Sequence, residues 1–407
     1  MLIKSSPPRR RRAVTVFGAV AAAGALALLA APLGAAAAVT PEPDLPIGTP
    51  AAAPLGTAGD DATARADDDG KYTLYRYDGA TRYEVAANVT LDAFAPGVPV
   101  LYIASGEKYP DALSAGPAAA EQGGGLLLVT PDAIPAATRE AITELKPQKL
   151  VVVGGTASVS TSVYDELVKL QPNTVRIDGA DRYEVSRNIV DYAFCGLLPG
   201  TIIDADSTGT DPVEPLPIDP GDPAACLGDG LDQVFVATGT NYPDALAAGP
   251  AASYVGGGVL LVPGWDASLD EPTHELLTRT GASVASIAGG PASVSDGIEA
   301  DLADSLATTV RYSGADRFEV AATINEAVFP AETDVMFMAS GAVFPDALSA
   351  GPVAAVYDAP LFLVRSNCYP PVTADAIFFG KFALDDLVIM GGYATVDRSF
   401  EDRPHYC

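Results

Sequence analysis

One ordered set of motifs occurs three times along this 407-residue chain. Each copy begins with Arg, then Tyr or Phe, Glu and Val, at Arg82, Arg182 and Arg317. A Pro-Asp-Ala-Leu segment and then a Gly-Gly pair follow in each copy, and the spacing from Arg to this Asp is the same in the first and third copies. The Pro-Asp-Ala-Leu segments are residues 110–113, 243–246 and 345–348, and the Gly-Gly pairs are 154–155, 289–290 and 391–392. Such self-similarity indicates one fold unit written three times, and it argues against a single active site.

The repeats fix a predicted domain organisation. The N-terminus reads as an export signal, with four arginines at 9–12, an apolar stretch and small residues near Ala38. An uncleaved membrane anchor is the alternative, because the apolar stretch is long enough to span a bilayer. No later segment has that length and apolarity, so we expect no membrane span once the signal is cleaved. The predicted parts are a signal peptide (1–38), a disordered spacer rich in Pro, Ala and Asp (39–70), a first repeat (71–173), a second repeat (174–309) and a third repeat (310–407).

Each repeat alternates short apolar runs with helical patterns. In the first repeat, runs at 100–104, 126–129 and 150–153 read as buried strands, and 111–122 and 136–145 read as helices. Continuous apolar strands separated by helices predict parallel βαβ units with both faces of the sheet covered. The expected fold is therefore an open three-layer α/β/α sheet, repeated.

Four cysteines in an exported chain favour disulfides, and three pairings are possible. Cys195 and Cys226 bracket an insertion found only in the second repeat, whereas Cys368 and Cys407 both lie in the third. We favour Cys195–Cys226 and Cys368–Cys407, because each bond then closes a local loop.

The chain carries 52 acidic and 24 basic residues, a formal net charge of −28. Such a surface repels nucleic acid, so nucleic acid is not an expected partner. The insertion, residues 195–232, is acidic, and Asp204, Asp206 and Asp211 within it resemble the start of a calcium loop. The loop lacks a closing glutamate, since Pro215 stands there, and a plain solvated acidic loop is the simpler interpretation. No other cofactor is expected.

The motif aspartates Asp111, Asp244 and Asp346 have two interpretations. Proline followed by aspartate suits the first turn of a helix, which explains the motif without any function. Alternatively, the motif follows a strand, and ligands of open parallel sheets bind beyond the carboxyl ends of strands. The aromatic residues before each proline share this position. They are Tyr109, Tyr242 and Phe344.

The three motif arginines also allow two interpretations. Each can form an ion pair within the fold, or its planar guanidinium can contact the hydroxyls or anionic groups of a polymer. The Gly-Gly pairs permit positive φ and read as tight turns or as anion-binding nests. Catalysis finds little support, because the two histidines, His274 and His405, are not equivalent and no hydrolase motif is present.

Together these motifs resemble the cell wall-binding repeat 2 family, over about residues 72–397. The resemblance implies three Rossmann-like modules packed with pseudo-threefold symmetry. It also implies non-catalytic, non-covalent attachment of an extracellular protein to a wall polysaccharide or secondary wall polymer of Gram-positive bacteria. The candidate polymer contacts are then the motif arginines, aspartates and aromatic residues. A wall-polymer hydrolase using carboxylates and a surface-layer structural component are the alternatives.

The chain departs from the pattern of this family at several places. We expect no effector domain beside the repeats. Ala247 replaces the serine of the other copies, and the third copy has Tyr393 and Thr395 after its Gly-Gly pair. If these positions touch polymer, the three sites are not equivalent. An acidic module of this kind should bind a neutral glycan, use its arginines locally, or bridge an anionic polymer through divalent cations.

Overall fold

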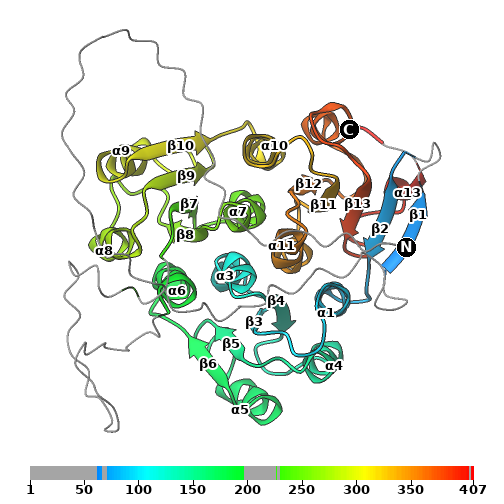
Figure 1. Ribbon diagram of the computed structural model, residues 1–407, viewed down its shortest axis with the longest axis horizontal. Coiled ribbons are helices and arrows are strands. Elements are labelled where there is room, and N and C mark those ends of the chain that lie inside the picture. Colours follow the sequence, from blue (N-terminus) through cyan, green and yellow to red (C-terminus); the bar gives the residue numbers. More distant parts are fainter. Residues whose placement is uncertain (1–61, 67–70, 197–225, 227–229, 403–404) are drawn as a thin grey trace, which may run out of the picture. The chain divides into compact units, whose positions relative to one another are not determined.

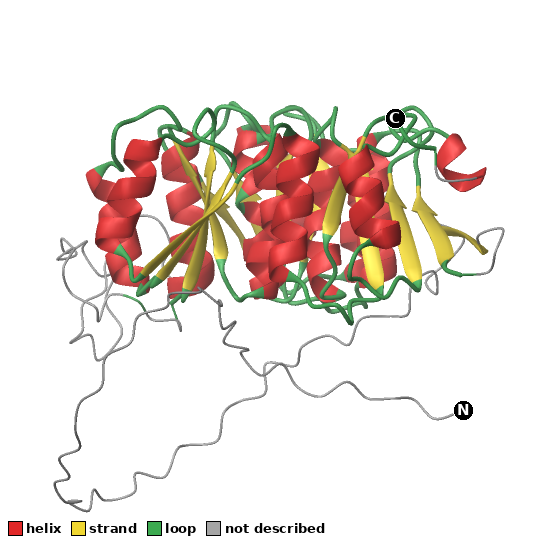
Figure 2. Ribbon diagram, turned by 90° about the horizontal axis from the view of Figure 1, so that it is seen from above, coloured by secondary structure: helices red, strands yellow, loops and turns green. Residues whose placement is uncertain are grey.

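Three open sheets, each with four parallel strands, surround a central group of helices (Figure 1). The computed structural model describes residues 62–66, 71–196, 226, 230–402 and 405–407, which all belong to one compact unit. Strands alternate with helices along the chain, and both run between two opposite faces of loops (Figure 2). The predicted fold class of three repeated α/β modules is confirmed.

The first sheet has the strand order β4-β3-β5-β6. Its strands β3, β4 and β5 are wholly buried, as their continuous apolar runs predicted. The predicted helix at 111–122 is divided at Ser114, which separates α2 from α3. The elements are α1 (Arg82–Ala93), β3 (Leu101–Ser105), α2 (Pro110–Leu113), α3 (Ala115–Glu121), β4 (Gly125–Val129), α4 (Ala136–Leu145), β5 (Leu150–Val153), α5 (Thr161–Leu170) and β6 (Thr174–Ile177).

The second sheet repeats this order as β8-β7-β9-β10. Its first helix runs into a π-helical turn, η1, that ends at the disulfide residue Cys195. The elements are α6 (Arg182–Val190), η1 (Asp191–Cys195), β7 (Gln233–Thr238), α7 (Pro243–Tyr254), β8 (Gly258–Val262), α8 (Glu271–Thr280), β9 (Val284–Ala288), α9 (Asp296–Ser305) and β10 (Thr308–Tyr312).

The third sheet has the order β12-β11-β13-β2-β1, and β1 is antiparallel to its neighbour. The elements are β1 (Ala62–Ala66), β2 (Thr73–Tyr77), α10 (Arg317–Val328), β11 (Val335–Ser340), α11 (Pro345–Val356), β12 (Leu361–Val364), α12 (Pro371–Ala374), a π-helical turn η3 (Asp375–Phe379), β13 (Asp386–Met390) and α13 (Ser399–Asp402).

Sheets and sequence repeats are offset by one strand. The strand that precedes each motif arginine completes the sheet of another repeat: β6 pairs with β5, β10 with β9, and β2 with β13. For β2 this pairing joins the start of the first repeat to the third repeat. The offset therefore links the three modules in a closed cycle.

Helices α3, α7 and α11 contact one another at the centre of the three sheets (Figure 1). Their small residues allow this approach: a Cβ added at Gly116 would lie 3.6 Å from Pro352, and one at Gly249 would lie 3.9 Å from Pro117. The segments with the sequence Ala-Gly-Pro in these helices thus pack against sister repeats. Proline opens α7 and α11, which agrees with the expected place of proline in a first helical turn.

Both predicted disulfides are confirmed. Cys195 bonds to Cys226 and Cys368 bonds to Cys407, and none of the described cysteines is free. The first bond closes the insertion of the second repeat, and the second ties residue 407 to the loop after β12.

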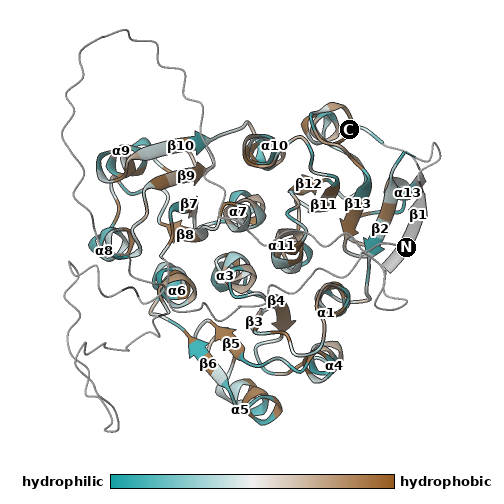
Figure 3. Cartoon of the chain, in the orientation of Figure 1, coloured by the Kyte–Doolittle hydropathy of each residue, from teal (hydrophilic) through white to brown (hydrophobic). Residues whose placement is uncertain are grey.

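Figure 3 shows apolar residues concentrated in strands such as β4 and β9, whereas the strand β6 is more hydrophilic. No helix in the described ranges combines the length and the apolar character needed to cross a bilayer.

Candidate functional site

The motif arginines open helices α1, α6 and α10, and the helix caps fix their positions. The residue before each arginine accepts a hydrogen bond from the backbone N–H three positions further along the chain, as Asp181 Oδ1 does from Glu184 at 2.9 Å. In return, the motif glutamate accepts from the backbone ahead of the cap, as Glu84 does from the N–H of Ala80 at 2.6 Å. This reciprocal pattern resembles a capping box. The glutamates that follow the motif aromatic residues therefore serve the helix starts.

In each module, the glycine that directly follows β3, β7 or β11 packs against the motif arginine and its aromatic neighbour. A Cβ at Gly106 would lie 2.7 Å from the ring of Tyr83 and 3.1 Å from Cδ of Arg82. The carbonyl of this glycine accepts a hydrogen bond from the Nη1 of its arginine. The pairs are Arg82 with Gly106 (2.5 Å), Arg182 with Gly239 (2.6 Å) and Arg317 with Gly341 (2.5 Å).

The motif aspartates meet the Gly-Gly pairs. Each carboxylate accepts a hydrogen bond from a hydroxyl just after the pair: Asp111 from Ser158, Asp244 from Ser293 and Asp346 from Thr395, at 2.7, 2.9 and 2.9 Å. The first glycine of each pair has positive φ, and a Cβ there would lie 2.3–2.5 Å from the aspartate Oδ2. Two motifs that are distant in sequence are thus in direct contact, the aspartate of one with the Gly-Gly turn of the other.

The aromatic candidates come together where the three repeats meet. The rings of Tyr109, Tyr242 and Phe344 contact one another pairwise, with centroids 5.3, 5.6 and 5.7 Å apart. Tyr109 donates its hydroxyl to the carbonyl of Thr240, and Tyr242 donates to that of Ala342, so each tyrosine reaches into the next repeat. Phe344 has no hydroxyl, and the third such bond is missing.

Each motif arginine faces the preceding repeat. The guanidinium carbon of Arg182 lies 6.0 Å from the ring centroid of Tyr109, and that of Arg317 lies 5.9 Å from Tyr242. The positive charge of Arg317 acts to lower the pKa of Asp244, and that of Arg82 acts to lower the pKa of Asp346. Every junction between repeats therefore combines an arginine with residues of the neighbouring repeat. Among the described residues none of the three arginines forms an ion pair with a carboxylate.

Two of the junction aspartates are buried, Asp244 at 8% and Asp346 at 4% exposure. Burial raises the pKa of both carboxyls, and the hydroxyl hydrogen bonds and the neighbouring arginines oppose that rise. A native pKa above the unfolded value means that these groups bind protons more tightly in the folded state. Their contribution to stability therefore grows as the pH falls through the native pKa and is complete below the unfolded pKa, about 3.9.

We expect a double variant, Asp244→Asn with Asp346→Asn, to lack this contribution. The unfolding free energy of the wild type minus that of the variant should rise on acidification from pH 7 to pH 4. Urea unfolding of both proteins across this range measures the difference. A flat or falling difference would contradict the assignment.

A second set of equivalent arginines was not identified from the sequence. Arg76, Arg176 and Arg311 each lie six residues before a motif arginine, on the strands β2, β6 and β10. Each donates from Nη1 to the carbonyl of the first glycine of a Gly-Gly pair. Their constant spacing from the motif arginines was the signal that could have revealed them.

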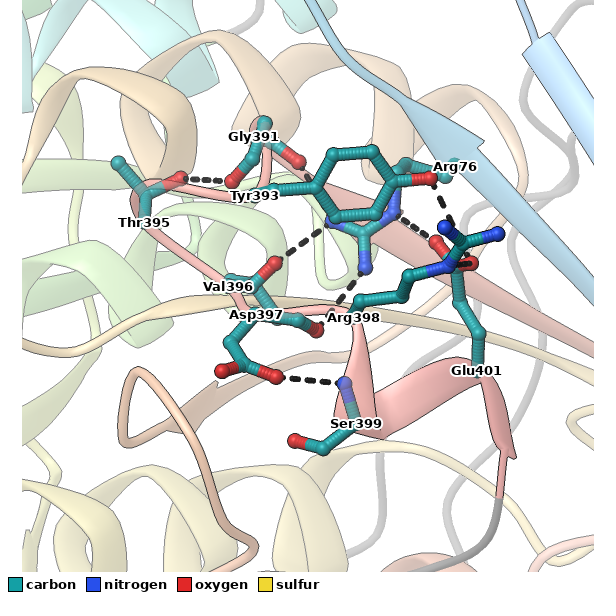
Figure 4. A network of polar contacts seen from close by, with 10 residues as sticks. Arg76, Gly391, Tyr393, Thr395, Val396, Asp397, Arg398, Ser399 and Glu401 are labelled. Carbon is teal, nitrogen blue, oxygen red and sulfur yellow. Dashed lines mark hydrogen bonds and ion pairs between the residues drawn. The ribbon is translucent and has the colours of Figure 1, made fainter.

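Arg76 is the most enclosed of this second set, and its network is drawn in Figure 4. It bonds to the carbonyls of Gly391, Val396 and Asp397 and pairs with Glu401 at 2.6 Å. This network fixes the loop of the third repeat onto a strand of the first. We assign these arginines a structural role.

The calcium candidates Asp204, Asp206 and Asp211 lie outside the described residues. Within the described ranges, no group of three or more His, Cys, Asp or Glu side chains is arranged to hold a metal ion.

Solved structures with the same fold include Cwp6 and Cwp8 from Clostridium difficile. Cwp6 matches with a TM-score of 0.67 and 21% identity, over 85% of this chain and 52% of that one. Cwp8 matches with a TM-score of 0.66 and 22% identity, over 81% of this chain and 50% of that one. At this identity the likeness shows the fold.

Curated relatives come from Bacillus subtilis (strain 168). The N-acetylmuramoyl-L-alanine amidase LytC is 24% identical over 305 residues, which cover 75% of this chain and 52% of that protein. The Amidase enhancer is 25% identical over 296 residues, or 72% of this chain and 35% of that protein. The chain thus spans about half or less of the length of these relatives.

The family model for cell wall binding domain 2 matches three segments, residues 76–164, 176–299 and 311–401. These segments coincide with the three sets of motifs and together cover most of the chain. The chain therefore belongs to the cell wall binding domain 2 (CWB2) family, which makes it an extracellular, cell wall-associated protein with a role in binding the wall.

Proposed function

We propose that the protein is a non-catalytic module that attaches to a polysaccharide or secondary wall polymer through its three junctions. At each junction the motif arginine contacts the polymer. The aromatic residue and the aspartate of the preceding repeat position the arginine. The contacts are Arg82, Arg182 and Arg317, and the positioning residues are Tyr109, Asp111, Tyr242, Asp244, Phe344 and Asp346.

The observation that carries this proposal is the bonding of the three guanidinium groups. A guanidinium has five N–H donors. Within the described structure, the side chain of each motif arginine makes a single hydrogen bond, to a glycine carbonyl. The remaining donors form a planar fork suited to hydroxyl, carboxylate or phosphate oxygens. In a chain with 24 basic and 52 acidic residues, three arginines held alike without carboxylate partners are best explained by an external ligand.

Three junctions add weak contacts along one polymer chain. When one repeat is bound, the others meet the polymer at a high effective concentration, so the total affinity exceeds that of any single junction. A hydrogen bond to a charged group contributes about 1.5–3 kcal/mol, or roughly tenfold or more in affinity. Loss of one arginine should therefore weaken wall binding about tenfold, and loss of all three should abolish it in practice.

Sedimentation with purified walls of the producing bacterium tests this expectation. The triple variant R82Q/R182Q/R317Q should stay in the supernatant under conditions in which the wild type pellets. Arg139→Gln is the matched control, since Arg139 is exposed and pairs with Glu166 on the outer helices α4 and α5. Soluble wall glycan should compete with the walls. Equal pelleting of the triple variant and the wild type would refute the role of the arginines.

The same assay separates the other possibilities. Parallel samples with calcium and with a chelator show whether divalent cations bridge the acidic protein to an anionic polymer. Pelleting without walls would favour a self-assembling surface component. Zymography on wall preparations should give no zone of lysis, because the carboxylates that recur in all repeats are engaged in helix caps and turns.

A further inference from the structure

Trp265 is the only tryptophan of the chain, and it is 68% exposed. It lies in the loop after β8, at the carboxyl end of a strand of the second sheet. Exposure of so large an apolar side chain leaves much of its surface in water, which is unfavourable unless a ligand covers it.

The loop holds Trp265 in place on both sides. The carbonyl of Gly264 accepts a hydrogen bond from the N–H of Ser295 at 2.7 Å, and the carbonyl of Asp266 accepts one from the Ser295 hydroxyl at 2.5 Å. A Cβ at Gly264 would lie 1.8 Å from the carbonyl oxygen of Ser293, so this loop packs directly on the Gly-Gly turn. The indole thus projects from a fixed backbone and can meet a ligand with little loss of conformational entropy.

The loop that carries Trp265 begins at the junction of the first and second repeats. The N–H of Gly239 donates to the carbonyl of Val262, where β8 ends and the loop begins. The same glycine binds Arg182 through its carbonyl and packs under the ring of Tyr183. The loop that carries the indole therefore starts at the glycine that anchors the junction arginine.

The other two repeats place different residues at this position. The backbone N–H groups of Ser160, Ser295 and Asp397 donate to Pro131, Gly264 and Ser366, respectively, which establishes the correspondence. The next residue in each loop is exposed: Asp132 in the first repeat, Trp265 in the second and Asn367 in the third. Only the second repeat carries an aromatic ring there.

We propose that Trp265 stacks on the face of an uncharged sugar ring of the polymer bound at the junction of the first and second repeats. The apolar C–H face of a pyranose matches the flat indole, whereas the hydroxyls at its edge suit the guanidinium of Arg182, which is bound to the glycine where this loop begins. Asp266, the next residue in the sequence and also exposed, disfavours an anionic sugar at this position. The inference rests on the proposed function and adds that the second repeat selects the sugar.

The single tryptophan provides a direct readout. Glycan released from protease-treated walls of the producing bacterium is separated by anion exchange into uncharged and anionic fractions. Titration of the full chain with the uncharged fraction should give a saturable shift of tryptophan emission. The anionic fraction should give a smaller shift at equal sugar concentration.

Variants complete the experiment. Trp265→Ala should bind the uncharged fraction about tenfold more weakly by calorimetry, and Trp265→Phe should recover most of the loss. Asn367→Ala is the matched control at the corresponding position and should bind like the wild type. If the wild type binds walls and Trp265→Ala binds the glycan equally well, the inference fails while the proposed function stands.

Two other outcomes also decide the matter. An emission shift that depends on protein concentration alone would assign Trp265 to contact with a second copy of the chain and overturn the inference. Absence of binding by the wild type to both walls and released glycan would overturn the proposed function, and this inference with it.

Discussion

Replacement of Arg76 with alanine is expected to destabilise the fold by about 3–5 kcal/mol, because it breaks a buried ion pair on one side only. The side chain of Arg76 is 1% exposed, and its partner Glu401 is 13% exposed. The variant would remove the Arg76 donors that now satisfy Oε1 of this carboxylate and three backbone carbonyls. Equilibrium unfolding in urea, followed by circular dichroism, measures the loss.

The position of Arg76 adds to this cost. Strand β2 belongs to the first repeat in sequence but pairs with β13 of the third. Arg76 therefore stabilises the strand pairing that closes the cycle of three modules. Its network in Figure 4 spans residues of both repeats. Weakening the pairing of β2 with β13 should favour partial opening of the third sheet. The rate of amide hydrogen exchange in β13 should therefore be higher in the variant.

The equivalent arginines provide matched controls. Arg311 pairs with Glu299, which is 35% exposed, and Arg176 has no carboxylate partner in the described structure. Alanine at these two positions should reduce the unfolding free energy by less than it does at Arg76. The loss should be largest for Arg76, smaller for Arg311 and smallest for Arg176. Equal losses at all three would show that enclosure of the ion pair does not decide the effect.

The sequence predicted much of this fold because its signals are local. Strands such as 150–153 are continuous apolar runs between helical patterns, and Pro243 and Pro345 mark helix starts. Both disulfides followed from the preference for closing local loops. The family resemblance, carried by the three sets of motifs, supplied the arrangement of the modules.

The remaining features depend on contacts between distant segments. Nothing in the sequence around Thr73–Tyr77 indicates that this strand pairs with β13, because the partner of a parallel strand is chosen by the whole fold. Nor does it reveal that Arg76 is buried, since arginine in a short strand usually faces solvent. The candidate site residues stay a prediction, and their grouping across repeats, such as Arg317 with Tyr242, required the structure.

Replacement of Gly154 with alanine should destabilise the protein by about 2–4 kcal/mol, whereas the same change at the adjacent Gly155 should have an effect within about 0.5 kcal/mol. Gly154 has φ of +91°, which alanine adopts only with strain. Its Cβ would also lie 2.3 Å from Oδ2 of Asp111 and 3.1 Å from Cβ of Ser158, the two residues whose hydrogen bond forms the turn.

Gly155 is the internal control for this change, because a Cβ there meets no atom within 4 Å. Both variants lose one glycine from the same turn, so they share any effect on the unfolded chain. Their difference in unfolding free energy therefore measures the contact between the Gly-Gly turn and the motif aspartate. Similar stabilities of the two variants would mean that the turn relaxes without cost, and the pairing of these two motifs would then not explain why each repeat contains both.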